Sequence, residues 1–205
     1  MPVIGDPNLE NDPTHKIKET KERLQQYGIN VYEVSGDLRE KETIANLYEI
    51  SRNKISVLVN NAAIPCYGIP IQEMSLEQVM NSLNTNLVSP IKLTHKIYPI
   101  FLQQGHGSII NINSIVGIEP KRFRSVHSAT KWGLKGFTKS LNIESQENNI
   151  NVINVYPTRI KTVAEFAYGL EPLDVAQRIY QEYAHGEADG ELVIDGRPKE
   201  FRGKQ

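Results

Sequence analysis

The sequence predicts an α/β fold, a doubly wound parallel sheet with helices on both faces, in a single domain. Two observations predict it. Short apolar runs, such as residues 55–59 and 109–112, are typical of strands that are buried on both faces. Longer segments between them repeat apolar residues three or four positions apart, which is the spacing of one helix face. Alternation of these two patterns is the arrangement that a parallel sheet with helical crossovers requires.

Three helices are predicted from apolar residues at helical spacing. These residues are Ile44, Leu47 and Tyr48; Leu87, Ile91, Tyr98 and Leu102; and Ala176, Ile179, Tyr180 and Tyr183. Ser75 and Gln78 form a capping box, which predicts that a further helix begins there. Gly105 and Gly107 mark the turn from the longest helix into the strand that ends at Ser114.

The chain ends in a predicted strand and a charged tail. Residues 190–196 place the apolar run Leu192–Ile194 between two glycines, which indicates the last strand. Residues 199–205 are rich in charge and are expected to form a C-terminal tail. No linker or repeat interrupts the elements before it. The domain is therefore assigned to residues 1–198.

Composition and charge exclude several classes of function. The 23 basic and 24 acidic residues give no net field that would attract nucleic acid or an anionic membrane. The single cysteine, Cys66, excludes an internal disulfide framework, and no apolar run is long enough to span a bilayer. The N-terminus carries Asp6, Glu10 and Asp12 and lacks the apolar segment of a secretory signal. We expect a cytoplasmic domain with a small-molecule substrate and no metal site.

Three polar residues are expected to meet in one cleft. His127 and Lys131 are four positions apart, so they project from the same helix face. Ser114 follows an apolar run and therefore lies at the end of a buried strand. Asn60 follows the preceding strand, and Asn86 is expected to open a helix.

At these residues the chain resembles the short-chain dehydrogenase/reductase family. Members of that family have an Asn-Asn-Ala-Gly turn, an Asn before a long helix, a Ser and a Tyr-x-x-x-Lys pair. The corresponding residues here are Asn60, Asn61, Ala62 and Ala63, then Asn86, Ser114, His127 and Lys131. Ser114 and His127 are 13 residues apart, the usual distance from serine to tyrosine in the family. The resemblance extends over about residues 3–198 and implies a Rossmann-like sheet.

The same resemblance implies that the beginning of the family fold is missing. The family starts with a strand and a glycine-rich turn, Thr-Gly-x-x-x-Gly-x-Gly, which holds the cofactor pyrophosphate at a helix N-terminus. The sequence has no such turn. Residues 1–8 resemble the second strand of the family, followed by its second helix (His15–Tyr27) and third strand (Asn30–Val34).

In the family the first strand lies at the centre of the sheet. Its loss would leave buried backbone groups unpaired, at about 1–3 kcal/mol each. Four explanations are open for this gap. The N-terminal segment moves inward, the neighbouring strands close up, a second chain covers the exposed surface, or the sequence is a fragment. A homo-oligomer, dimer or tetramer, is expected.

Four residues have catalytic roles by resemblance. In the family the tyrosine exchanges a proton with the substrate oxygen while hydride moves to or from nicotinamide, and the serine hydrogen-bonds the substrate carbonyl. The lysine binds the nicotinamide ribose, and the asparagine anchors a water chain. These roles fall on Ser114, His127, Lys131 and Asn86. An imidazole transfers protons near neutral pH, but the Lys131 cation favours its neutral form, a usable base and a poorer acid.

Each of these residues also has a structural interpretation. Ser114 ends a strand through a local bond to the backbone, Lys131 is a solvated helix residue, and Asn86 caps a helix. His127 is then a tolerated substitution in a site that is no longer used. The sequence leaves both sets of roles open.

The resemblance also implies a NAD(P) site, with weak or absent binding because the glycine-rich turn is missing. Its residues would be Asp6 at the ribose, Asp37 and Leu38 at the adenine, Asn60, Ala62 and Lys131 near the nicotinamide, and Pro157, Ile160 and Thr162 of the Pro-Gly-x-x-x-Thr segment. Thr158 replaces the glycine of that segment, so a side chain occupies a place where the backbone approaches nicotinamide. Tyr156 is a core residue of the strand or a replacement phenol.

Three functions follow from these patterns. The first is a NAD(P)-dependent oxidoreductase of carbonyl and hydroxyl substrates that is impaired in cofactor binding and redox chemistry. The second is a non-redox enzyme, such as an isomerase, lyase or cyclase, that uses His127 as acid or base. The third is a non-catalytic relative that associates through its long helices, about Asn86–Gln104 and Val126–Ser145.

Overall fold

A computed structural model of the chain describes residues 20–53, 55–162, 169–185 and 190–198. Its centre is a parallel sheet whose described strands lie in the order β1-β2-β3-β4. These strands are β1 (Val57–Asn60), β2 (Gly107–Ile112), β3 (Ile150–Pro157) and β4 (Glu191–Ile194). The predicted parallel α/β sheet is confirmed.

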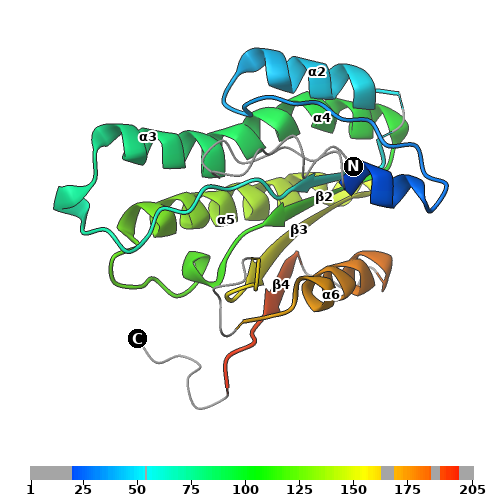
Figure 1. Cartoon of the computed structure of the whole chain (residues 1–205). Coiled ribbons are helices and arrows are strands. Elements are labelled where there is room, and N and C mark those ends of the chain that lie inside the picture. Colours follow the sequence, from blue (N-terminus) through cyan, green and yellow to red (C-terminus); the bar gives the residue numbers. More distant parts are fainter. Residues whose placement is uncertain (1–19, 54, 163–168, 186–189, 199–205) are drawn as a thin grey trace.

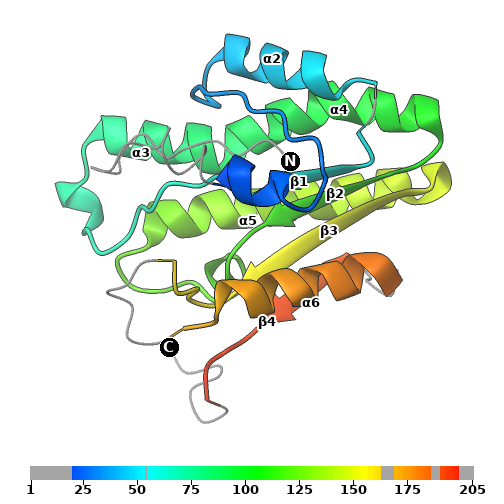
Figure 2. The same cartoon turned by 45° about the vertical axis from the view of Figure 1, so that its right-hand side comes forward.

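Helices lie on both faces of this sheet (Figure 1). They are α2 (Lys41–Ser51), α3 (Leu76–Leu83), α4 (Ser89–Gln104), α5 (Ser125–Ser145) and α6 (Pro172–His185). Shorter helical turns are Ile71–Glu73, Ile115–Gly117 and Gln146–Asn148, together with a π-helical turn, Asn84–Val88, that joins α3 to α4. Residues 20–25 are also helical. Helices α4 and α5 cover one face, and α6 covers the other, as Figure 2 shows from a second side.

Two apolar clusters hold the layers together. Between the sheet and helices α4 and α5 lie buried residues that include Phe101, Ile109 and Val152, all fully inaccessible to solvent. On the opposite face Ile153 and Val155 of β3 pack with Val175 of α6. Burial of this apolar area is the main favourable contribution to folding.

Local sequence signals begin and end the elements as predicted. The Ser75 Oγ accepts from the Gln78 amide at 3.1 Å, and the Gln78 Oε1 accepts from the Ser75 amide at 2.9 Å, so the capping box that begins α3 is confirmed. Gly105 ends α4 in the left-handed conformation with φ 71°. A Cβ on Gly107 would lie 2.3 Å from the Phe101 ring, so β2 and α4 pack closely only because that residue is glycine.

The prediction of a strand at Asn30–Val34 is wrong. Residues 29–35 form no strand, and Tyr32 is 62% exposed. A strand needs a hydrogen-bonded neighbour, and no described strand pairs with the outer edge of β1. Of the predicted helix His15–Tyr27, only residues 20–25 are seen as helix before a turn at 26–28. The predicted strand in residues 1–8 and the tail 199–205 lie outside the described residues.

The prediction that Asn86 opens a helix is also wrong. Asn86 lies in the π-helical turn in the middle of a continuous helical segment from α3 to α4. Leu102, one of the apolar residues at helical spacing, is 44% exposed. The buried face of α4 contains Ile97 and Phe101 instead.

Candidate functional site

The predicted catalytic residues lie around the carboxyl end of β2. Ser114 follows this strand, and its Oγ accepts a hydrogen bond from the Val116 amide at 3.4 Å. The local bond predicted for a strand-ending serine is therefore present. The Ser114 amide donates to the Asn113 Oδ1 at 2.9 Å, which fixes the backbone at this point.

Lys131 of α5 is buried against the end of β2. Its side chain is only 3% exposed, and the Nζ donates to the Ile112 carbonyl at 3.0 Å. Burial lowers the pKa of this ammonium from 10.5 to about 8. The interpretation of Lys131 as a solvated helix residue is wrong, because the helix face that carries it packs on the sheet.

His127 lies one helical turn before Lys131 and is 8% exposed. Its Nδ1 has no hydrogen-bond partner, and its ring meets the edge of Tyr67 at a centroid distance of 6.0 Å. Burial lowers the imidazole pKa from 6.5 to about 4, and the charges of Lys131 and Arg124 act in the same direction. The imidazole is therefore neutral at pH 7. Lys131 was expected to favour this form, but burial is the larger cause.

No hydrogen bond joins Ser114, His127 and Lys131 to one another in the part of the chain that the structure describes. Lys131 contacts the strand that ends two residues before Ser114, and its charge acts on His127. Lys131 is thus an electrostatic neighbour of His127 and contacts the backbone two residues before Ser114.

Asn86 holds the segment that follows β1. Its Oδ1 accepts from the Ile64 amide at 2.8 Å, and its Nδ2 donates to the Ile64 carbonyl at 3.0 Å and to the Ser82 Oγ at 3.3 Å. The side chain is 1% exposed. The cap predicted for Asn86 is absent, because the residue lies inside a helix. π-helical turns occur frequently at functional sites, where they direct a side chain out of the regular helix.

A row of buried amides packs beside this region, and the sequence reasoning identified Asn60 among them but missed Asn111, Asn113 and Asn154. The Asn60 Nδ2 donates to the Asn111 Oδ1 at 2.8 Å, and the Asn111 Nδ2 donates to the Thr138 Oγ1 at 2.8 Å. The Asn113 Nδ2 donates to the Asn154 Oδ1 at 3.1 Å and to the Lys131 carbonyl at 3.0 Å. Asn111 of β2 and Asn113 just after it alternate with isoleucines, so polar residues at positions i and i+2 of a buried strand and its end were the available signal.

The residues predicted at the adenine have other partners. The Asp37 carboxylate accepts from the Arg39 amide at 2.8 Å and from the Arg39 Nε at 2.7 Å, and these bonds hold its pKa below the usual value. The Leu38 carbonyl accepts from the Ser89 Oγ at 3.0 Å. Asp6 lies outside the described residues. Ala62 is half-buried and lies two residues after Asn60.

The segment after β3 turns back toward the last strand. Pro157 pairs in register with Ile194, and the Thr158 Oγ1 accepts from the Gly196 amide at 3.0 Å. Ile160 bridges to Leu170, and the Thr162 amide donates to the Ile160 carbonyl at 2.9 Å. Tyr156 is fully buried, and its hydroxyl donates to the Glu191 Oε1 at 2.7 Å, so the prediction of a core residue is confirmed. Burial, the larger cause, and this bond raise its phenol pKa.

The residues expected at the nicotinamide end lie near one edge of the sheet. Asn60 ends β1 and Lys131 contacts the end of β2, at the carboxyl ends of the strands, which is where α/β sheets bind their ligands. At the adenine end the Asp37 carboxylate is already bound by Arg39. No Gly-rich turn for a pyrophosphate occurs among the described residues.

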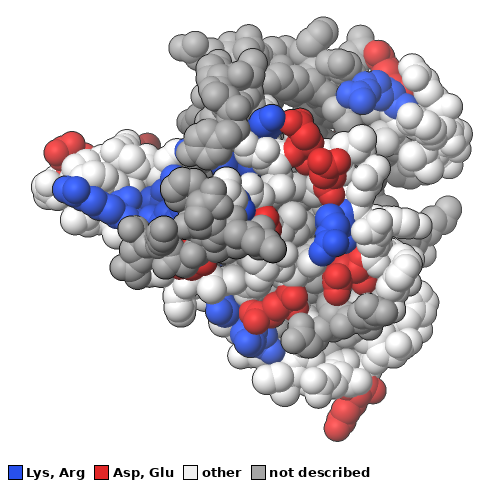
Figure 3. Space-filling model, turned by 90° about the horizontal axis from the view of Figure 1, so that it is seen from below, with Lys and Arg blue, Asp and Glu red and all other residues white. Residues whose placement is uncertain are grey.

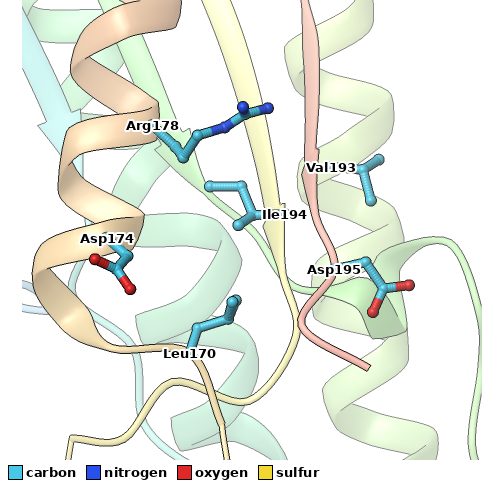
Figure 4. Close-up of a pocket in the computed structure, with 6 residues that line it drawn as sticks. All are labelled: Leu170, Asp174, Arg178, Val193, Ile194 and Asp195. Carbon is cyan, nitrogen blue, oxygen red and sulfur yellow. The ribbon is translucent and has the colours of Figure 1, made fainter. Parts of the chain in front are cut away.

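Other features of the surface do not include the predicted site residues. An open hollow of about 550 Å³ between α6 and β4 is lined by Leu170, Asp174, Arg178, Val193, Ile194 and Asp195 (Figure 4). On the face shown in Figure 3, acidic and basic side chains lie in small mixed groups. Within the described ranges, no three His, Cys, Asp or Glu residues are placed to hold a metal ion, and no helix is both long and apolar enough to cross a membrane.

Comparison with known proteins identifies the origin of this arrangement. The family model for short chain dehydrogenase matches residues 10–168. The chain belongs to the short-chain dehydrogenase family. The parallel sheet that ends beside Asn60 and Ser114, with Lys131 on the helix that packs against it, is therefore the sheet of a member of that family.

Relatives and solved structures agree with this assignment. Carbonyl reductase family member 4 of Xenopus laevis is 38% identical over 126 residues, which cover 60% of this chain and 53% of that protein. Retinol dehydrogenase 8 of Homo sapiens is 30% identical over 129 residues, which cover 63% of this chain and 41% of that protein. The chain thus spans about half the length of these relatives.

A metagenomic short-chain oxidoreductase, solved in complex with NADP, superimposes with a TM-score of 0.74 at 25% identity. The alignment covers 88% of this chain and 80% of that chain. The described sheet and its flanking helices are thus those of the family.

Proposed function

We propose that the chain acts in nicotinamide-dependent oxidoreduction of small carbonyl and hydroxyl compounds, with weak cofactor binding and impaired proton transfer. The observation that carries the proposal is the buried Lys131 ammonium at the end of β2, beside His127 and Ser114. Burying an ammonium costs free energy, so a lysine kept there without a carboxylate partner suits a site that uses its charge.

The NADP bound to the metagenomic relative and the carbonyl reductase name of the Xenopus laevis relative support this choice of chemistry. Lys131, Asn60 and Ala62 would hold the nicotinamide half of the cofactor, which supplies or accepts hydride when it is bound. Pro157, Ile160 and Thr162 would border it. Asp6, Asp37 and Leu38 would contribute little to affinity without a pyrophosphate turn.

Ser114 would orient the substrate oxygen, and His127 would exchange a proton with it. An imidazole with a pKa of about 4 is neutral at pH 7, so it can take a proton from an alcohol. It has no proton that it readily gives to an alkoxide. We therefore propose that His127 serves this proton transfer poorly in both directions, as a weak base toward the alcohol and as an uncharged group toward the carbonyl oxygen.

A second candidate function is supported by the unpartnered Nδ1 of His127. A neutral, buried imidazole with a free nitrogen can act as a base without any cofactor. In a non-redox enzyme, such as an isomerase, lyase or cyclase, His127 would abstract a proton and Ser114 would bind the substrate oxygen. Neutral-pH activity with no nicotinamide present would favour this candidate.

The decisive experiment combines two changes. A strand and glycine-rich turn from a relative would be fused before Met1, and His127→Tyr would be introduced alone and together with the fusion. Carbonyl reduction, followed by oxidation of NADPH, should appear only in the combined protein, because proton transfer contributes about 10²–10⁴-fold and needs a bound cofactor. Lys131→Met in the combined protein should remove the activity.

Two outcomes would contradict the proposal. Reduction by the unmodified chain at the rate of an ordinary family member would show that neither cofactor binding nor proton transfer is impaired. A correctly folded combined protein with no nicotinamide-dependent activity on any carbonyl or alcohol tested would leave the cofactor-independent candidate in its place.

A further inference from the structure

Two loops close over His127 and carry an excess of positive charge. One loop follows β1 and contains Tyr67 and Gly68. The other runs from the turn after β2 to the start of α5 and contains Phe123 and Arg124. The Gly68 amide donates to the Phe123 carbonyl at 2.8 Å, so the two loops are joined through their backbones. Phe123 has φ 58°, a conformation that non-glycine residues adopt rarely and keep where the surroundings require it.

This junction places a guanidinium beside His127. The Arg124 Cζ lies 4.7 Å from the centroid of the Tyr67 ring, and the edge of the same ring meets His127. The Arg124 charge is one of the causes that lower the His127 pKa. Arg124 is thus a close electrostatic neighbour of His127 and is held in place by an aromatic face.

Three cations lie close together in the sequence of this loop. Lys121, Arg122 and Arg124 lie within four residues, and none forms an ion pair in the described part of the chain. Glu119, the acidic residue of the loop, is bound by Arg197 at 2.6 and 3.1 Å. The pKa of Lys121 is lowered first by burial and then by the charges of Arg197 and Arg124, while the Glu119 and Asp195 carboxylates act in the opposite direction.

The first turn of α5 adds to the same field. Arg124 is its N-cap residue, and the positive end of the helix dipole lies here. Two side-chain atoms of this turn, the His127 Nδ1 and the Ser128 Oγ, are buried without a partner. Positive charge, an unsatisfied helix start and unpaired polar atoms therefore occur together beside the proposed proton-transfer residue.

We propose that Lys121 and Arg124 form a subsite for the anionic group, a carboxylate or a phosphate, of the small molecule that reacts at His127. The assignment rests on the proposed function only in placing the reaction at His127. Substrates would thus be hydroxy or oxo compounds that carry an anion near the reacting carbon. Arg124 would bind the anion with charge-assisted hydrogen bonds, and Lys121 would supply a second positive charge.

The test is a titration without nicotinamide, so its outcome does not depend on hydride transfer. The ¹⁵N-labelled chain would be titrated with 3-hydroxybutyrate, with inorganic phosphate and with neutral 1,3-butanediol, while the amide resonances of residues 119–128 are followed. We expect saturable shifts with at least one anion and none with the diol. The tighter of the two anions identifies the group as a carboxylate or a phosphate.

Arg124→Gln should weaken anion binding by about tenfold or more, the effect of losing one charge-assisted hydrogen bond. Arg124→Lys should retain part of the affinity, and Lys121→Gln should lose part of it. Arg52→Gln, which changes an exposed arginine of α2, is the matched control and should bind as the parent does. Absence of saturable binding by both anions, equal affinity of Arg124→Gln and the parent, or equal binding of the diol would overturn the proposal.

Discussion

Burial and charge act in the same direction on the imidazole of His127. Its surroundings exclude water, and two nearby cations oppose protonation, so its pKa lies at about 4 instead of 6.5. A histidine in this environment behaves as a weak neutral base. At pH 7 the His127 side chain therefore carries no charge.

We predict that acid weakens the fold through this residue. Between pH 6.5 and about 4 the unfolded chain binds a proton at His127 that the folded chain does not. The free energy of unfolding therefore falls as pH decreases through this range, by up to about 3 kcal/mol. Urea unfolding at a series of pH values, compared with His127→Gln, measures the effect. A pH dependence that is the same in both proteins would contradict it.

At the scale of the elements, polar side chains cross the sheet beneath the candidate site. Asn60, Asn111, Asn154 and Glu191 are partners in register on β1 to β4. A slip of one residue would move these side chains to the opposite face, which is packed with apolar residues. The amides therefore specify the strand register at the place where Ser114 and Lys131 are positioned.

We predict that Asn111→Ala lowers the free energy of unfolding by about 2–4 kcal/mol, because the amide of Asn60 and the hydroxyl of Thr138 each lose a buried partner. Urea unfolding measures the loss. Asn148→Ala is the control, since the exposed Asn148 amide donates only to the Glu144 carbonyl, and its cost should be below about 0.5 kcal/mol. Similar losses in the two variants would show that the row contributes no more than an exposed side chain.

At the scale of the whole molecule, the outer edge of β1 has no partner strand among the described residues. An exposed edge offers unpaired backbone groups to another chain. The same side of the sheet is where the family holds the cofactor pyrophosphate. Two predictions concern these consequences.

The first is that NADH and NADPH bind with dissociation constants in the millimolar range or more weakly, where 1 mM corresponds to about −4.1 kcal/mol. The Asp37 carboxylate is bound by Arg39, and a nicotinamide half-site alone offers few contacts. Calorimetric titration of the unmodified chain is the measurement. A micromolar dissociation constant would sink this prediction.

The second is that the chain forms a homodimer or larger assembly at micromolar concentration, because association covers the unpaired edge. Sedimentation velocity measures the mass over a range of concentrations. If the protein is a monomer at every concentration and unfolds cooperatively in urea, the backbone groups at the outer edge of β1 are satisfied within one chain.

The sequence predicted those parts of the fold that depend on local signals. The capping box at Ser75, the glycine at 105 and the apolar runs of β1 and β2 act through their immediate neighbours, so each could be identified without tertiary information. Residues 30–34 failed as a strand because a strand depends on a distant partner. Asn86 failed as a helix start because no local pattern marks a π-helical turn.

For the candidate site, the sequence pointed to residues but not to their environment. The spacing of Ser114, His127 and Lys131 made them candidates, but the burial of Lys131 depends on how α5 lies against β2. Asn113 was missed for the same reason. Its amide joins α5 to β3, and these contacts exist only once the strands are in register.

The π-helical turn at Asn84–Val88 means that α3 and α4 are one rod with an extra residue at its middle. An α-helix advances by about 100° per residue, so this insertion sets the rotation of α3 about the axis of α4. Deletion of one residue here would convert the segment into a regular, unbroken α-helix. Helix α3 would then be rotated about the axis of α4 by about a quarter of a revolution. The Asn86 amide would leave the Ile64 backbone, and the loop with Tyr67 would lose its anchor. The rotation of α3 relative to α4 thus determines whether the loop with Tyr67 is held against His127.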